Sequence, residues 1–447
     1  MSRYGVRAVL PIALAVSLGI AGCGSDKKTP TPGGGKASGA SPSAAEVSGS
    51  IAFVGVWTGD EQKAFQAVLD GFKAKFPKVT VKYQPAGDQL PTVLSTAVQG
   101  GNPPDLASVA QPGLVKDFAT KGSLKPIDFA SGDISSNFPE SFVKLGTIDG
   151  KLYGMFFKAA NKSTVWFNTT AYQTAGVSPA TSWDDFLKNA KTLKASGVPA
   201  YSIGGADGWT LTDLFENIYL RTAGADMYDK LAAHQIPWTD ASVKTALGEM
   251  AKVVGDTPNI AGGTAGALQT DFPSSVTQAF TTPPKAAQVL EGDFVAGVIT
   301  SMTKAKPATG FDEFAFPAIN GSKAAVMGGG DEVVMFKDSP AAQALVKYLA
   351  TAEAATIWAK LGGFSSPNKN VEASVYPDDI TRKTATAIAQ AETFRFDLSD
   401  LQPASFGGTV GQGEWKLLQD FLRRPTDVNG IASQLEAAAA KAYASGK

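Results

Sequence analysis

Aromatic, hydroxyl and carboxylate side chains stand together in the segment GVWTGDEQKAF, from Gly55 to Phe65. Trp57 ends a strand-like apolar run, and Thr58 and Asp60 follow before a helix-like run begins. An indole ring can cover the apolar face of a sugar-like solute, while nearby oxygens accept hydrogen bonds from its hydroxyl groups. The alternative is structural: Trp57 closes a core, and Asp60 is a helix-start charge.

A second group of such residues stands in the segment GGADGW, where Asp207 and Trp209 flank a glycine. An acid, a glycine and a tryptophan together on a loop are hard to explain by packing, so we expect both side chains to contact a ligand. Asp88 and Asp331 are further carboxylates that would accept hydrogen bonds, and charged acceptors form the stronger ones. Gly329 and Gly330 precede Asp331 and either allow a ligand to approach the backbone or form a strained turn.

Few residues are available for nucleophilic or metal chemistry. His234 is the only histidine and Cys23 the only cysteine. A Ser-His-Asp triad would need His234, and the sequence has no HExxH, CxxC or Walker A motif. We therefore expect no metal, no cofactor and no enzyme. A secreted glycoside hydrolase remains the alternative, because it needs only two carboxylates about 5–10 Å apart across a sugar.

Length and charge restrict the class of protein. The chain has 447 residues, more than a single hydrophobic core usually serves, so we expect more than one lobe. The formal net charge is −1, which gives no reason to expect a nucleic-acid partner.

The N-terminus is typical of an exported lipoprotein. Arg3 and Arg7 precede an apolar run at 8–20 that is too short to span a bilayer. The run ends in IAGC, which resembles a lipobox and predicts a signal peptide over 1–22 with lipidation (palmitate) of Cys23. Residues 23–48 then form the lipidated cysteine and a Gly/Ser/Pro-rich flexible tether. We expect a body anchored by lipid at the extracellular face of a bacterial cell membrane.

Strand-like and helix-like segments alternate after the tether. The order β-α-β-α-β is predicted for 51–57, 60–76, 79–83, 89–98 and 105–109. This order is typical of a doubly wound parallel sheet, in which ligands bind beyond the carboxyl ends of the strands. Trp57, Thr58 and Gln111 follow strands in this way.

The remaining chain is predicted mainly as helices. A strand closes at 166–168, and Ser182 begins a helix. Further along, 297–300 is strand-like, 311–316 is a predicted crossover, and one long helix runs from Ser339 to Leu361. Other predicted helices cover 212–224, 240–254, 414–422 and 428–444.

Several of these segments together resemble a known family. They include GNPPD at 101–105, Tyr153-Gly154, Trp166-Phe167-Asn168, GGADGW at 204–209 and FRFD at 394–397. The likeness covers nearly all of residues 50–445 and is to the extracellular solute-binding lipoproteins of ABC-type carbohydrate importers, the maltose-binding protein family, and within it to α-glucoside-binding proteins.

The resemblance implies a type II periplasmic-binding-protein fold, with two doubly wound α/β lobes joined by a hinge. The first lobe would comprise 49–157 plus 312–370, and the second 158–311 plus 371–445. A monomer would capture an oligosaccharide, an α-glucoside such as maltose or trehalose, between the lobes. It would deliver the sugar to ABC permease subunits served by a separate ATPase. A polyol or a peptide is the alternative solute.

The resemblance also assigns site residues. Asp207 and Trp209 correspond to an acid and an aromatic residue of the second lobe, and Asp293-Phe294 to a further stacking position where Phe replaces Trp. Gln111 takes the place of an acidic residue. The full set of expected ligand-binding residues is Trp57, Thr58, Asp60, Asp88, Gln111, Lys158, Asp207, Trp209, Asp293, Phe294, Gly329, Gly330, Asp331 and Arg395.

Overall fold

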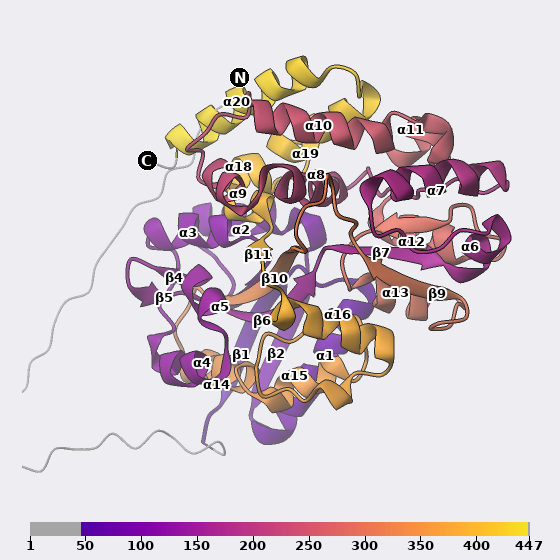
Figure 1. The fold of residues 1–447 in the computed structure, drawn as a ribbon. Helices are drawn as coiled ribbons and strands as arrows, with labels where there is room; N and C mark the ends of the chain where they lie inside the picture. Colours follow the sequence, from indigo (N-terminus) through magenta and orange to yellow (C-terminus); the bar gives the residue numbers. More distant parts are fainter. Residues whose placement is uncertain (1–45, 446–447) are drawn as a thin grey trace, which may run out of the picture. The chain divides into compact units, whose positions relative to one another are not determined.

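The computed structural model describes residues 46–445. Cys23 and most of the predicted tether lie outside them. The described chain contains a 6-stranded sheet, a 3-stranded sheet and a two-stranded hairpin, with helices covering the two larger sheets (Figure 1). No helix within residues 46–445 is long and apolar enough to cross a membrane.

The larger sheet has the strand order β11-β10-β3-β1-β2, and β6 also pairs with β10. β1 is parallel to β2 and β3, whereas β10 is antiparallel to β3 and β6. Its strands are β1 (Gly49–Gly55), β2 (Val79–Pro85), β3 (Leu106–Val109), β6 (Gly154–Asn161), β10 (Val326–Met335) and β11 (Phe394–Phe396).

Alternating side chains bury both faces of this sheet. Ile51 and Phe53 of β1 point into one core, and Val54 points into the other. The first core is completed by α1 (Gly59–Lys75), α14 (Pro340–Leu349) and α15 (Ala352–Ala359). The second is completed by α2 (Leu90–Gln99) and α3 (Pro112–Thr120). Helices on both faces of a mostly parallel sheet are the expected doubly wound arrangement.

The smaller sheet has the order β8-β7-β9, with β7 antiparallel to both neighbours. Its strands are β7 (Thr164–Asn168), β8 (Gln288–Leu290) and β9 (Phe311–Ala315). Val165 and Phe167 face a large core, and Trp166 faces a separate one. The large core contains α6 (Thr169–Ala175), α7 (Trp183–Ala195), α8 (Trp209–Ala223), α10 (Ala241–Val254), α19 (Gly413–Arg423) and α20 (Val428–Ser445), and the other contains α12 (Phe272–Phe280) and α13 (Val295–Met302).

Further strands and α-helices lie between these elements. They are β4 (Thr147–Ile148), β5 (Lys151–Leu152), α4 (Ser131–Asn137), α5 (Glu140–Leu145), α9 (Ala225–Ala232), α11 (Gly263–Ala267), α16 (Asp379–Gln390), α17 (Leu398–Leu401) and α18 (Ala404–Gly407).

The chain passes repeatedly between the two sheets. β6 runs into β7 through Lys162 and Ser163, and β9 is followed by β10 of the larger sheet (Figure 1). The boundaries expected at 157/158 and 311/312 fall inside β6 and β9. The division of the chain into lobes at those positions stays a prediction.

Three predicted elements differ from the structure. Residues 297–300, expected as a strand, belong to helix α13, where Val295, Ala296 and Ile299 all pack into one core. Their helical spacing outweighs the strand preference of the β-branched residues. Residues 311–316, expected as a crossover, contain strand β9. The long helix expected from Ser339 is two helices, because Thr351 accepts a hydrogen bond from the Ala354 amide and begins α15.

Candidate functional site

A cavity of about 670 Å³ lies where elements of both sheets meet. This volume is in the range typical of small-molecule sites. Ten of the expected ligand-binding residues line it: Thr58, Asp60, Asp88, Gln111, Lys158, Asp207, Trp209, Phe294, Gly330 and Asp331.

Trp57 does not line the cavity. Its side chain has 0% exposure and packs among the rings of Phe65, Phe157 and Trp358. Its indole N–H donates a 2.7 Å hydrogen bond to Oδ2 of Asp331, which does line the cavity. Trp57 therefore closes the first core, as the structural alternative has it, and its indole also holds a carboxylate of the cavity.

The three other expected residues also lie outside the cavity lining. Asp293 is buried, accepts hydrogen bonds from the Asn161 amide and the Ser365 hydroxyl, and has its pKa raised to about 6 by burial. Gly329 lies within β10, where an added Cβ would meet the side chain of Lys162. Arg395 lies on β11 and donates to Asp229 at 2.6 Å.

Aromatic rings form one wall of the cavity. Trp209, at the start of α8, Phe272, at the start of α12, and Phe294 have centroids 5.2–5.9 Å apart. Each ring lines the cavity, as do Trp358 and Trp415. Rings grouped in this way can pack against the C–H faces of a sugar.

Lys158 holds two carboxylates at the cavity. Its Nζ lies 2.5 Å from Oε1 of Glu61 on α1 and 3.8 Å from Oδ2 of Asp331 on β10. The ammonium also lies 5.4 Å from the Phe294 ring centroid. Burial alone would lower the pKa of Lys158, but Glu61 and Asp331 raise it, so the ammonium stays charged.

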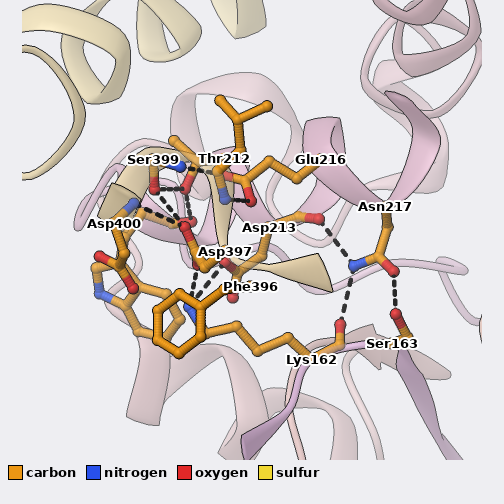
Figure 2. Close-up of polar contacts among 12 residues, drawn as sticks. Lys162, Ser163, Thr212, Asp213, Glu216, Asn217, Phe396, Asp397, Ser399 and Asp400 are labelled. Atoms are coloured by element: carbon orange, nitrogen blue, oxygen red, sulfur yellow. Dashed lines mark hydrogen bonds and ion pairs between the residues drawn. The ribbon is translucent and has the colours of Figure 1, made fainter. Parts of the chain in front are cut away.

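Lys162 is the centre of a second and larger polar group (Figure 2). Its Nζ lies 2.5 Å from Asp397 and 3.0 Å from Asp213 of α8. The ammonium holds the pKa of Asp397 low despite burial, whereas burial raises the pKa of Asp213 to about 7. Glu216, one turn along α8, accepts hydrogen bonds from the Leu398 and Ser399 amides. These contacts join the β6–β7 connection, α8 and the start of α17.

Two carboxylates of the cavity lining come from segments distant in sequence. Asp88 follows β2 in the chain, and Asp207 precedes α8. Burial and the nearby Asp207 raise the pKa of Asp88 to about 6, while a hydrogen bond with Trp209 opposes this shift. Asp207 accepts a 2.7 Å hydrogen bond from the Phe272 amide, and burial raises its pKa.

Polar groups near the first sheet complete the lining. Thr58 is the N-cap residue of α1 but makes no side-chain capping bond, so its hydroxyl is free of that role. Gln111 is buried at the start of α3, and its Oε1 has no hydrogen-bond partner among the described residues. Gly330 is required by packing, because a Cβ there would meet the Lys158 carbonyl and the Phe156 ring. These groups add acceptors and a hydroxyl to the carboxylates.

Several lining residues were missed at the sequence level, namely Lys162, Phe272, Asp397, Ser399, Asp400 and Trp415. The segment FRFDLSD at 394–400 was a usable signal, because it combines two acids and a serine with aromatic residues. Lys162 and Phe272 carry no local signal, since only the long-range fold brings them to the cavity. Within residues 46–445, no group of three or more His, Cys, Asp or Glu residues could hold a metal ion.

Known proteins with similar sequences are binding proteins. The osmoprotective compounds-binding protein of Synechocystis sp. is 33% identical over 380 residues, covering 83% of this chain and 88% of that protein. The alpha-glucosides-binding periplasmic protein of Rhizobium meliloti is 31% identical over 388 residues, covering 83% of each chain.

Solved structures share the fold at lower identity. The bacterial solute receptor AcbH, described as preferring β-D-galactopyranose, superposes with a TM-score of 0.76 at 22% identity, covering 89% of this chain and 99% of that one. The acarbose-binding GacH receptor of Streptomyces glaucescens gives 0.69 at 17% identity, covering 89% and 98%. These matches confirm the expected type II periplasmic-binding-protein fold.

Residues 57–356 match the family described as bacterial extracellular solute-binding protein. This match covers more than half of the chain, and the two sequence relatives cover most of it. The chain belongs to the bacterial extracellular solute-binding protein family.

Proposed function

We propose that this protein is the substrate-binding component of an ABC importer and captures an α-glucoside such as maltose or trehalose. The observation that carries the proposal is the composition of the cavity wall. Trp209, Phe272 and Phe294 stand beside Asp88 and Asp207, so apolar C–H faces and hydroxyl groups can be bound together. The α-glucoside-binding relative supports the sugar class.

The proposal includes a ligand-dependent closure about a hinge. Asp88 and Gln111 come from segments packed on the larger sheet, whereas Trp209 comes from a helix packed on the smaller one. A sugar that contacts both sides would favour the conformation in which the two sides are close. The liganded form would then dock on permease subunits that a separate ATPase drives.

The second candidate is an osmoprotective solute of polyol type. The relative with 33% identity is named for osmoprotective compounds, and a polyol offers the same hydroxyl donors. Such a solute lacks the sugar ring that the aromatic wall would cover. A peptide is the weaker possibility, because Lys158 and Lys162 are both paired with carboxylates of the chain.

Thermal unfolding of the full chain against a ligand panel tests the proposal. The panel contains mono- and disaccharides, malto- and cello-oligomers, polyols and peptides. A ligand at about 100 times its Kd should stabilise the folded state by about 2.7 kcal/mol. A shift with α-glucosides that is lost in Trp209→Ala would support the proposal, whereas a shift with polyols alone would favour the second candidate.

The hydrolase alternative needs a separate measurement. Asp88 and Asp207 are carboxylates with raised pKa values in a cavity, and paired carboxylates of this kind can hydrolyse glycosides. We expect no free glucose to appear when the bound α-glucoside is incubated with the full chain. Steady release that Asp207→Asn abolishes would overturn the binding-only function.

Lipid anchoring through Cys23 is part of the same proposal and rests on the sequence. Cys23→Ala should move the protein from the membrane fraction to the medium, and mass spectrometry of the wild-type N-terminus should find the acyl chains. An unmodified N-terminus in the membrane-free fraction of wild-type cells would exclude the anchor.

A further inference from the structure

The cavity lining is strongly acidic. Eight carboxylates line it, against three lysines. The acids are Asp60, Glu61, Asp88, Asp207, Asp271, Asp331, Asp397 and Asp400, and the lysines are Lys63, Lys158 and Lys162. A lining of this charge opposes an anionic ligand.

Each of the three lysines forms an ion pair with a carboxylate of the protein itself. Lys158 pairs with Glu61 and Asp331, and Lys162 pairs with Asp397 and with Asp213 behind the wall. Lys63 is an exposed residue on α1 that pairs with Asp60 at 2.7 Å. No lysine of the lining is therefore left to balance the remaining acids.

Asp400 is the acid with the fewest partners. It is 6% exposed, lines the cavity, and its carboxylate makes no hydrogen bond or ion pair with residues 46–445. Its backbone amide donates to Oδ1 of Asp397, and the dashed line at Asp400 in Figure 2 is this contact. Burial and the neighbouring Asp397 raise the pKa of Asp400 well above the usual range.

The charges around Asp400 favour a cationic group on the ligand. Asp397, Asp213 and Asp331 raise the pKa of Asp400, whereas the ammonium of Lys162 opposes them. Lys162 forms ion pairs with Asp397 and Asp213, so these two carboxylates balance most of its charge. Without a partner the buried Asp400 therefore favours its protonated form, and a charged donor from the ligand would stabilise the carboxylate form instead.

We infer that Asp400 is the binding point for a protonated amine, so that the cavity takes an amino-substituted glycoside more tightly than the matching neutral one. This inference rests on the proposed function, since it concerns a substituent on the same sugar-like ligand. The hydroxyl groups of that ligand would still meet Asp88 and Asp207. A carboxylate or phosphate group on the ligand would be excluded by the same charges.

Titration calorimetry of the full chain at pH 7.5 tests the inference. The probes are trehalose, maltose and the derivatives of trehalose in which one hydroxyl, at C2, C3, C4 or C6, is replaced by an amine. We expect one position of substitution to lower Kd at least tenfold relative to trehalose, because an amine at one position only can reach Asp400. Glucuronic acid and trehalose 6-phosphate should not bind measurably.

Two variants assign the effect to Asp400. In Asp400→Asn the advantage of the amine should disappear while the Kd of trehalose changes by less than about fivefold, and Asp400→Ser serves if the first variant fails to fold. Glu332→Gln is the matched control, because it also removes a buried carboxylate without a partner but lies outside the cavity. It should keep the full advantage.

The outcomes separate the two proposals. If trehalose or maltose binds and every amine binds equally or more weakly, the inference is overturned and the proposed function stands. An advantage that survives in Asp400→Asn also overturns it, because another carboxylate would then bind the amine. If neither the neutral sugars nor the amines bind, the proposed function itself fails.

Discussion

The buried indole of Trp57 holds a carboxylate that lines the cavity. Its N–H and the Nζ of Lys158 approach the same oxygen of Asp331, at 2.7 Å and 3.8 Å. The second carboxylate oxygen of Asp331 takes no part in these two contacts. Trp57 is a positioning residue, and its effect on binding should act through Asp331.

Replacing Trp57 by Phe should weaken both folding and ligand binding. A hydrogen bond to a charged group contributes about 1.5–3 kcal/mol, so we expect a loss of stability of that order. Because Asp331 would then be free to turn, the Kd of the bound glycoside should rise about tenfold, measured by calorimetry.

Trp238→Phe is the matched control for this prediction. Trp238 is also fully buried, but its indole N–H has no partner among residues 46–445 and it lies outside the cavity. This variant should lose stability without losing affinity. An unchanged Kd in Trp57→Phe would show that Asp331 needs no support from the indole.

Glu332 is a second buried acid, and it has no role in the cavity. It is 0% exposed on β10, and neither carboxylate oxygen has a hydrogen-bond partner among the described residues. Gly154 makes room for it, because a Cβ on Gly154 would overlap the carboxylate. Burial raises the pKa of Glu332 well above its usual range, so the folded protein holds a proton there.

Glu332→Gln should make the protein more stable at alkaline pH. The folded pKa is above the unfolded one, so this residue's contribution is fully present below the unfolded pKa and is lost as pH rises towards the folded pKa. Each pH unit across that interval removes about 1.4 kcal/mol in the wild type but nothing in the variant. Urea unfolding at pH 4.5 and pH 8 should show a difference that grows with pH, and an equal difference at both values would contradict the assignment.

At the scale of elements, glycine sets how closely helices approach. Gly113 lies in the first turn of α3, and a Cβ there would overlap the Gln402 carbonyl just after α17. This contact brings α3 of the larger sheet against the segment that carries Asp397 and Asp400. The position of Asp397 and Asp400 in the cavity therefore depends on Gly113, which lies outside the cavity lining.

Gly113→Ala should destabilise the protein by a few kcal/mol, because backbone must move to admit the methyl group. Gly248→Ala is the control: this glycine lies inside α10 with nothing within 4 Å of its added Cβ. Alanine is favoured over glycine in a helix interior by about 1 kcal/mol, so this variant should be more stable than the wild type. Equal effects of the two substitutions, read from thermal unfolding, would contradict the packing argument.

Local patterns predicted the elements near the N-terminus well and some later ones poorly. The segment from β1 to β3 was expected from alternating and helical periodicity, and each of its elements is present within two residues of the expected bounds. The strand predicted at 297–300 was wrong, because the apolar β-branched residues of α13 suit a strand equally well when the surface they pack against is unknown. β9 was missed because pairing with β7 brings together residues about 150 positions apart.

At the scale of the whole molecule, Lys162 joins segments that are distant in sequence. Its ammonium contacts Asp213 and Asp397, which are 51 and 235 positions away. Ten of the residues expected from short motifs and the resemblance line the cavity, and their contact with a ligand stays a prediction, whereas the group around Lys162 was not expected. No local pattern tells which of 40 basic residues meets which acid.

Lys162→Met should destabilise the protein strongly, because it leaves two buried carboxylates unpaired. Breaking a buried ion pair typically costs about 3–5 kcal/mol. The loss should shrink as pH falls, since Asp213 and Asp397 can then take up protons. Lys63→Met is the control, because its ion pair is exposed, and its unfolding free energy should change by less than about 1 kcal/mol.

Strand β10 pairs with β3, β6 and β11, and it arrives only after residue 325. β1 pairs directly with β2 and β3, but β6 is joined to β3 only through β10, so a chain that emerges from its N-terminus holds β3 and β6 without the strand between them. The core around β7 is likewise completed by α19 and α20, near the end of the chain. The larger sheet and the core around β7 are thus both completed by late segments of the chain, which suits a protein whose family works outside the cell.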